Sequence, residues 1–305
     1  YIKEAIIKFT KNRSIYFILT FPRIRTVEYM KMPIIEIINS YYPSLTNSEQ
    51  KVATFVQENL GKVIYYSVTD LADEAGVGET TVLRFCRKIG LKGYQEFKLT
   101  IAQNLSEGER DKDNSEASNF IQSIRGNTIK AIENTASMII ENDLEAAIEL
   151  LNKARTISFF GVGTSGITAL DAKSRLLRIG RPSEAITDSH LQAMSAATLT
   201  AEDVVVGLSI SGSTRDTLEA LEIAKMAGAK IIAITYYSRS PITQFADIVL
   251  LGGAKESPLE GGSLTAKISQ LFIVDLLCTG LALQSKDKSL EMKQKTAKAV
   301  VNKIY

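Results

Sequence analysis

Cysteine, histidine and long apolar runs are scarce in this sequence, and each shortage excludes a class of protein. The 305 residues include 2 cysteines and 1 histidine. Cys86 and Cys278 fall in different expected helices, which gives neither a disulfide framework nor the spacing of a cysteine metal site. No uninterrupted apolar run reaches the roughly 18–20 residues that a membrane-spanning helix needs. We therefore expect a cytoplasmic protein with no membrane partner, no bound metal and no cofactor.

A strong charge of either sign is also lacking, because the formal net charge is only +2 at pH 7. A hydrophobic share of 45% and a charged share of 23% are ordinary for a globular protein. The length suits about two domains with a sizeable core. Total charge does not indicate a nucleic-acid partner, so the local distribution of charge has to decide that question.

Residues 1–32 are basic and have no clear amphipathic period. Met30 and Met32 stand just before the first recognisable domain, and the natural product could start at either. We treat 1–32 as an N-terminal extension and exclude it from the fold prediction. The alternative is a basic arm that touches DNA phosphate.

Residues 33–105 have the pattern of a small helical domain. Cap residues over 46–50 precede apolar residues at helical spacing, and Ser67 or Thr69 opens a second helix. A third helix follows after a short turn. Two short helices joined by a glycine-containing turn predict a helix-turn-helix. The glycines that separate these segments are Gly61, Gly76, Gly78 and Gly90.

Basic residues gather on the third helix and in the stretch after it, which we expect to be a loop. This is the layout of a recognition helix in the major groove followed by contacts to phosphates. The alternative is a solvated basic face. Arginine suits the edge of guanine and threonine suits the thymine methyl group. The predicted DNA-binding residues are Glu79, Thr80, Thr81, Arg84, Arg87, Lys88, Lys92, Tyr94 and Lys98.

The rest of the chain predicts a second domain of another class. Residues 106–119 are charged without apolar periodicity and should form a linker, and 286–305 a C-terminal helical tail. Between them, residues 120–285 alternate near-continuous apolar strands with helices. This alternation implies an α/β fold with a doubly wound parallel sheet. Ligands of such sheets bind at the C-terminal ends of the strands.

One strand end in this domain is unusually rich in hydroxyl groups. Ser209, Ser211, Ser213 and Thr214 follow the apolar strand 204–208 and precede a helix. A helix N-terminus has free N–H groups and a positive dipole end, so this corner suits an anion. The alternative is a polar turn with one serine cap, although one cap needs only one hydroxyl. We predict phosphate binding here.

A second loop, 161–166, matches the Gly-x-Gly-x-x-Gly dinucleotide pattern after a strand, with Asp188 about 20 residues on. Read alone, this pattern favours NAD. However, Thr164 and Ser165 put hydroxyl groups inside the turn, and a second hydroxyl loop follows another strand. Two such loops at neighbouring strand ends would converge on one compact phosphate, so we predict a phosphate clamp that includes Gly163.

Taken together, these motifs resemble a known pair of domains. Residues 161–165 with 209–214 resemble the sugar isomerase (SIS) domain, and residues 80–98 look like the helix-turn-helix of the RpiR family. The resemblance covers about residues 33–285. It implies a transcriptional regulator, dimeric or tetrameric, that binds operator DNA and senses a sugar phosphate. Carried over, the phosphate ligands would be Ser165, Ser209, Ser211 and Thr214, with Ser213 at a variable position.

Three further residues are candidate contacts to the sugar. His190 follows a strand end that should face the pocket, and Glu260 lies in a loop near the last strand. Lys267 stands where regulators of this family often carry Ser-Arg. The competing interpretations are a structural histidine and solvated loop charges.

An enzyme is the alternative from another class. A phosphosugar isomerase or lyase would need an acid/base pair, for which His190 with Glu256 or Glu260 is the obvious choice. The helix-turn-helix would then be unexplained. A third interpretation is a DNA-binding oligomerisation module with a vestigial pocket. We favour a regulator without catalytic residues, in which effector binding sets the spacing of two recognition helices.

Overall fold

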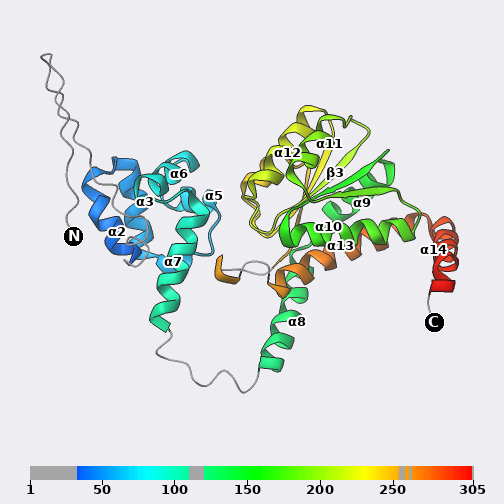
Figure 1. The fold of residues 1–305 in the computed structure, drawn as a ribbon, viewed down its shortest axis with the longest axis horizontal. Helices are drawn as coiled ribbons and strands as arrows, with labels where there is room; N and C mark the ends of the chain where they lie inside the picture. Colours follow the sequence, from blue (N-terminus) through cyan, green and yellow to red (C-terminus); the bar gives the residue numbers. More distant parts are fainter. Residues whose placement is uncertain (1–32, 110–119, 254–257, 261–262, 304–305) are drawn as a thin grey trace, which may run out of the picture. The chain divides into compact units, whose positions relative to one another are not determined.

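The computed structural model describes residues 33–109, 120–253, 258–260 and 263–303 (Figure 1). The predicted N-terminal extension and residues 110–119 of the predicted linker lie outside these ranges. The first four residues of that linker, 106–109, are helical, because the helix before it continues to Glu109.

The N-terminal part is helical, as predicted. Thr46 and Ser67 each form a capping box with the residue three positions on, so both predicted starts are confirmed. Gly76 has φ 64° in the turn before the recognition helix, a conformation that glycine adopts without strain. The elements are α2 (Ile34–Tyr41), η1 (Tyr42–Ser44), α3 (Asn47–Glu58), α4 (Leu60–Val63), α5 (Val68–Glu74), α6 (Glu79–Lys88) and α7 (Tyr94–Glu109).

Helix α7 corrects one expectation, because the stretch after the recognition helix was predicted to be a loop. Tyr94, Phe97 and Ile101 recur at helical spacing and are buried. The Phe97 ring packs edge-on against Phe85 of α6, with ring centroids 5.7 Å apart. This apolar stripe makes α7 part of the domain core.

The second domain contains the predicted parallel sheet. Its five strands lie in the order β2-β1-β3-β4-β5, and every neighbouring pair is parallel. The chain therefore winds from β1 to one edge and then returns to build the other side. The strands are β1 (Ile157–Phe160), β2 (Ser183–Ile186), β3 (Val204–Leu208), β4 (Lys230–Thr235) and β5 (Ile248–Leu251).

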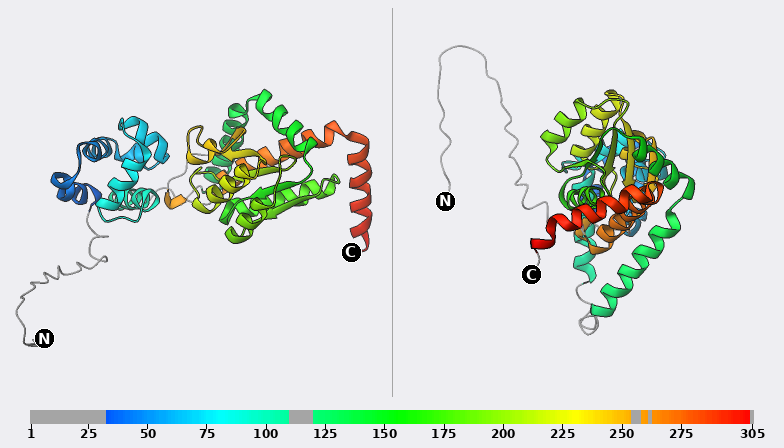
Figure 2. Two further views of the ribbon diagram at one scale, coloured as in Figure 1. Left: turned by 90° about the horizontal axis from the view of Figure 1, so that it is seen from above. Right: turned by 90° about the vertical axis from the view of Figure 1, so that its right-hand side faces the viewer.

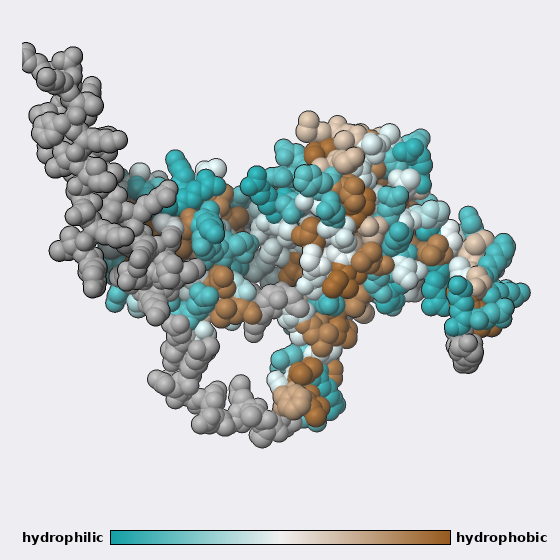
Figure 3. Space-filling view, viewed as in Figure 1, coloured by the Kyte–Doolittle hydropathy of each residue, from teal (hydrophilic) through white to brown (hydrophobic). Residues whose placement is uncertain are grey.

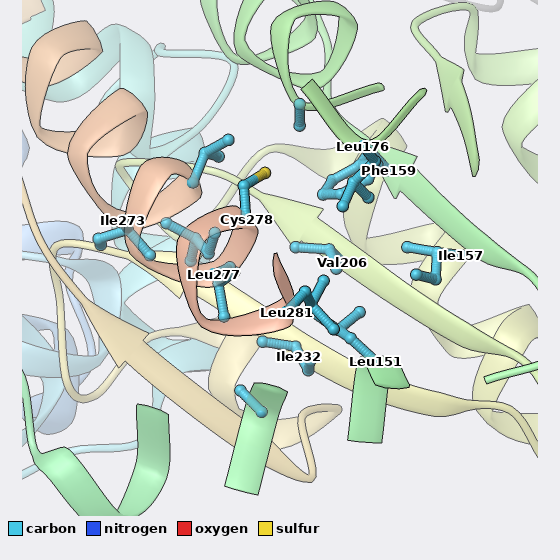
Figure 4. Close-up of a cluster of buried hydrophobic side chains, with 14 of the residues drawn as sticks. Leu151, Ile157, Phe159, Leu176, Val206, Ile232, Ile273, Leu277, Cys278 and Leu281 are labelled. Atoms are coloured by element: carbon cyan, nitrogen blue, oxygen red, sulfur yellow. The ribbon is translucent and has the colours of Figure 1, made fainter. Parts of the chain in front are cut away.

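Helices cover both faces of this sheet (Figure 1). On one face Phe159 and Val206 join a core with Leu176 and Leu277 (Figure 4). On the other, Val205 packs with residues of the opposite helix layer. The helices are α8 (Phe120–Met138), α9 (Glu141–Lys153), α10 (Gly163–Arg178), α11 (Ser189–Ala197), α12 (Arg215–Met226), α13 (Leu264–Gln284) and α14 (Lys286–Val300), with η3 (Pro241–Gln244), η4 (Pro258–Glu260) and η5 (Val301–Lys303).

Helix α11 goes beyond the sequence prediction, whereas the C-terminal helical tail was predicted. The prediction did not include α11, whose nine residues follow β2. Helix α13 is 21 residues long and is apolar enough to cross a membrane by length and composition, although Ile273, Leu277 and Leu281 sit in the domain core. The predicted helical tail corresponds to α14, which follows α13 directly (red in Figure 2).

Candidate functional site

The two polar loops follow neighbouring strands at the point where the sheet reverses its winding. Phe160 of β1 lies opposite Gly207 of β3 in the parallel register. The strand order 2-1-3-4-5 places its topological switch point between these two strands. Ligands of doubly wound sheets generally bind at such a switch point, outside the carboxyl ends of the strands.

The loop after β3 is held by its own hydroxyl groups. Ser209 is 1% exposed, and its Oγ shares a hydrogen bond of 2.9 Å with Thr214 Oγ1. Ser213 Oγ donates to Ser211 Oγ at 3.2 Å. Gly212 has φ 61°, and a Cβ there would lie 2.1 Å from Ser240 Oγ. The structure therefore brings all four predicted hydroxyl residues of this loop together.

The loop after β1 is shaped by its glycines. A Cβ on Gly166 would lie 2.9 Å from Thr187 Cγ2 and 3.0 Å from the Gly161 carbonyl oxygen. Gly163 has φ 56° and opens α10. Close helix–strand packing at Gly161 and Gly166 and the positive φ of Gly163 therefore account for the Gly-x-Gly-x-x-Gly pattern. Asp188, the acidic residue of the apparent dinucleotide pattern, caps α11 by accepting from the Leu191 N–H at 2.9 Å.

The helices that start at these loops have no side-chain cap. No side chain accepts a hydrogen bond at the N-cap of α10, Val162, or at the N-cap of α12, Thr214. In the first turn of α12, the buried Thr217 hydroxyl has no hydrogen-bond partner among the described residues. Two helix N-termini with free N–H groups therefore start from adjacent strands, and both suit an anion.

Gln270 is a site residue that the sequence analysis missed. Its Nε2 donates to Ser165 Oγ at 3.1 Å, and its Oε1 accepts from Thr168 at 3.1 Å. Gln270 is 1% exposed and comes from α13, so it holds the Ser165 hydroxyl in place. A glutamine in an otherwise apolar helical run was the signal available in the sequence.

The predicted sugar contacts are less closely grouped. His190 is exposed in the first turn of α11, directly after the edge strand β2. Lys267 is half-buried in the first turn of α13, beside the capping residue Ser263. Glu260 ends η4, and Glu256 lies outside the described residues. The acid/base pair of the enzyme alternative therefore stays untested.

The exposed face of α6 carries part of the predicted DNA-binding set. Thr80, Arg84 and Arg87 are exposed at positions i, i+4 and i+7, so they share one helix face. Lys92 is exposed in the turn before α7. The side chains of Thr80, Arg84 and Arg87 therefore present hydroxyl and guanidinium groups that can donate hydrogen bonds, and none of the three is a carboxylate.

The other predicted DNA contacts point into the protein. Glu79 accepts from Thr69 at 2.6 Å, which joins the two helices of the motif, and Lys88 pairs with Glu49 at 3.0 Å. Thr81, Tyr94 and Lys98 are 7%, 6% and 5% exposed. These contacts give the five residues structural roles within the domain, and their expected contacts to DNA stay a prediction.

Lys98 shows such a structural role in detail. Its Nζ donates to the Tyr66 carbonyl at 2.9 Å and lies 5.8 Å from the centroid of the Tyr94 ring. Burial lowers the pKa of Lys98 to about 8, because an apolar surrounding disfavours the charged form.

The opposite ends of β1 and β3 carry a different polar cluster. The Asp203 carboxylate, at the start of β3, accepts from Arg155 at 2.6 and 3.0 Å and from Thr156 at 2.6 Å. It also accepts from the N–H and the hydroxyl of Thr200 at 2.8 and 2.9 Å. The hydrogen bonds from Arg155 hold the pKa of Asp203 well below its usual range.

Comparison with known proteins agrees with both halves of the chain. The helix-turn-helix domain of the rpiR family matches residues 32–108, and the SIS domain matches residues 150–280. An HTH-type transcriptional regulator of Haemophilus influenzae is 39% identical over 277 residues, which cover 87% of this chain and 95% of the relative. Another, from Caldanaerobacter subterraneus, is 38% identical over 249 residues, covering 80% of this chain and 88% of the relative.

A solved structure extends the likeness to the whole fold. The Vibrio vulnificus NanR protein complexed with ManNAc-6P has a TM-score of 0.80 to this chain at 28% identity, over 89% of this chain and 100% of that one. The two domains, their order and most of their length are thus shared with known regulators. The chain belongs to the rpiR family of helix-turn-helix transcriptional regulators and carries a SIS domain behind its DNA-binding domain.

Proposed function

We propose that this regulator senses a sugar phosphate in its SIS domain and changes its affinity for operator DNA in response. The phosphate would lie between Gly163, Ser165 and the loop 209–214, where both helix N-termini lack side-chain caps. That absence of caps is the observation that carries the proposal, because it leaves N–H groups free beside the hydroxyl groups. The sugar phosphate bound to NanR supports this class of effector.

The proposed DNA surface is the exposed face of α6. Thr80, Arg84 and Arg87 would enter the major groove, and Lys92 would contact a phosphate. Removing a bidentate arginine contact to guanine costs about 1–3 kcal/mol of discrimination. We therefore expect Arg84→Ala to weaken specific binding by roughly tenfold to a hundredfold.

We also propose that the regulator acts as a homodimer or homotetramer in the cytoplasm. Ile167, Leu170 and Leu177 form a stripe on α10, with exposed fractions of 55%, 52% and 62%. Such a stripe suits a second copy of the chain, and paired recognition helices need a symmetric partner. Light scattering of the wild type against Leu170→Glu would test this, since a monomeric wild type contradicts the proposal.

The test of the effector site measures effector binding and DNA binding separately. Ser209→Glu places a carboxylate where the phosphate would lie, so it should abolish any thermal shift with ManNAc-6P, glucosamine 6-phosphate or glucose 6-phosphate. DNA fragments selected by the wild-type protein should still bind this variant. Thr198→Glu, at the exposed C-cap of α11 and outside both the loops and the α10 stripe, serves as the control. A Ser209→Glu protein that still responds to these compounds would place the effector elsewhere.

We propose that the SIS domain binds without turning its ligand over. The relatives from Haemophilus influenzae and Caldanaerobacter subterraneus are named transcriptional regulators, and a sensor needs only reversible binding. Incubation with aldose and amino-sugar phosphates should yield no product. A measurable rate that disappears in His190→Ala would favour the isomerase alternative instead.

A further inference from the structure

Helix α8 packs against its own chain on one face and exposes apolar residues on another. On the packed face Ala131 and Thr135 are 2% and 0% exposed, and Ser269 Oγ of α13 donates to the Ala131 carbonyl at 3.4 Å. Figure 3 shows apolar side chains gathered over α8 and the start of α13. A contiguous exposed apolar surface marks a contact with a partner.

The exposed apolar residues of α8 follow a regular pattern. Ile121, Ile129 and Ile132 are 65%, 43% and 36% exposed. With Arg125 and Ala136, which are also exposed, they recur every three or four residues and so share one face of the helix. We refer to these five residues as the α8 stripe. Such spacing is typical of a helix that packs along a second helix.

Two opposite charges stand at equal distances from the middle of the α8 stripe. Arg125 and Glu133 are both exposed, one helical turn before and one turn after Ile129. Arg125 Nη1 donates to Gln122 Oε1 at 3.3 Å. Within the described ranges neither charge belongs to an ion pair, so both are available to a partner.

An antiparallel second copy of α8 pairs both of these charges. In two helices that cross at Ile129, Arg125 of each copy lies beside Glu133 of the other, and the two-fold axis makes the two ion pairs equivalent. A parallel pair would instead place arginine beside arginine and glutamate beside glutamate, which is repulsive. Charges that flank an apolar stripe set the partner and its orientation. This arrangement therefore selects the same helix of a second copy, in the antiparallel orientation.

We propose that α8 pairs with α8 of a second copy of this chain through the α8 stripe. This surface is separate from the stripe on α10, and two separate two-fold contacts on one chain build a closed tetramer. Residues 110–119 join α7 to α8, so the pairing also brings together the attachment points of two DNA-binding domains. The inference extends the proposed homo-oligomer and does not depend on the α10 contact.

Light scattering of the full chain tests the pairing by reversing one charge at a time. In Arg125→Glu two carboxylates meet at both contacts, so the mass should halve and the concentration for half-dissociation should rise at least tenfold. Glu133→Arg should have the same effect, because it brings two cations together. An equimolar mixture of the two variants has opposite charges at both contacts, so it should regain the wild-type mass.

The double variant Arg125→Glu/Glu133→Arg carries both reversals in one chain. It should also regain the wild-type mass, which a folding defect would not allow. Lys130→Glu is the matched control, because Lys130 is exposed on α8 outside the stripe, and it should keep the wild-type mass.

An Arg125→Glu protein with the wild-type mass, or a mixture that stays at the halved mass, overturns the inference. The α10 contact fails separately, because Leu170→Glu would then leave the mass unchanged while Arg125→Glu still halves it. A monomeric wild type overturns this inference together with the proposed homo-oligomer.

Discussion

The two ends of β1 and β3 hold polar groups in opposite ways. At the amino ends, a fully charged group, Asp203, accepts hydrogen bonds from Arg155, Thr156 and Thr200. At the carboxyl ends, neutral hydroxyl groups bond mainly to one another, as Ser209 does with Thr214. One cluster is saturated by the protein, whereas the other keeps bonding capacity that a ligand can use.

This contrast separates a structural cluster from a binding site. A buried carboxylate needs several donors to offset the loss of water, and once it has them it offers nothing to a ligand. A buried hydroxyl group with only some of its hydrogen bonds formed costs less free energy than an unpaired buried carboxylate. It can also rotate to donate to a phosphate oxygen. We therefore expect substitutions at the amino ends to change stability and substitutions at the carboxyl ends to change effector binding.

The largest expected effect is on stability, at the amino end. Asp203→Ala removes the buried acceptor of charge-assisted hydrogen bonds from Arg155 and of further bonds from Thr156 and Thr200, which should lower the free energy of unfolding by about 2 kcal/mol or more. Denaturant unfolding measures this change. Asp275→Ala is the control: its carboxylate pairs with Arg175 but is 60% exposed, so the cost should stay below about 1 kcal/mol. Equal losses in both variants would contradict the contrast.

Lowering the pH tests the same cluster without a substitution, because it protonates the carboxylate. The pKa of Asp203 is lower in the folded chain than in the unfolded chain, so the unfolded state binds the proton first as the pH falls. The stabilisation is complete above about pH 5 and is lost below about pH 4, by up to about 1.4 kcal/mol per pH unit. Asp203→Asn should unfold with a weaker pH dependence between pH 5 and pH 3 than the wild type. Parallel curves would show that other carboxylates dominate.

Much of this organisation was predictable because it depends on local patterns. The apolar strands and the caps at Thr46 and Ser67 follow from short-range spacing. The positions of the hydroxyl loops at neighbouring strand ends followed from the parallel sheet, because β1 and β3 are paired. The sequence therefore sufficed for the helical part, the parallel sheet and the position of the two hydroxyl loops, while phosphate binding by these loops stays a prediction.

What the sequence did not predict depends on contacts between distant segments. Gln270 reaches Ser165 across 105 positions, and no local pattern records that bond. Lys98 was predicted to be a phosphate contact because its charge continued a basic run, yet α7 turns it toward the Tyr66 carbonyl. A run of charged residues shows only which residues follow one another along the chain. The direction in which each side chain points depends on which face of its helix is apolar and packs against the core.

At the carboxyl end, Ser211→Ala should change effector binding while leaving the stability of the protein almost unchanged. Ser211 is only half-buried and its hydroxyl bonds with Ser213, so we expect the free energy of unfolding to change by less than about 0.5 kcal/mol. Affinity for glucose 6-phosphate should fall about tenfold, because one donor to the phosphate is lost. Thr198→Ala, at the exposed C-cap of α11, should change neither quantity. A loss of stability comparable to that of Asp203→Ala would remove the distinction between the two ends.

The smallest expected effect separates backbone from side-chain donors in the clamp. Gly163 has φ 56°, and a Cβ there would meet no atom within 4 Å. Gly163→Ala should therefore cost only about 1 kcal/mol of stability, from the backbone conformation alone. The variant keeps the N–H group that would face the phosphate, so affinity for glucose 6-phosphate should stay within about threefold of the wild type in calorimetry. A much larger loss would mean that the ligand occupies the open space beside Gly163, and that the loop after β1 binds by close approach as well as by its hydroxyl group.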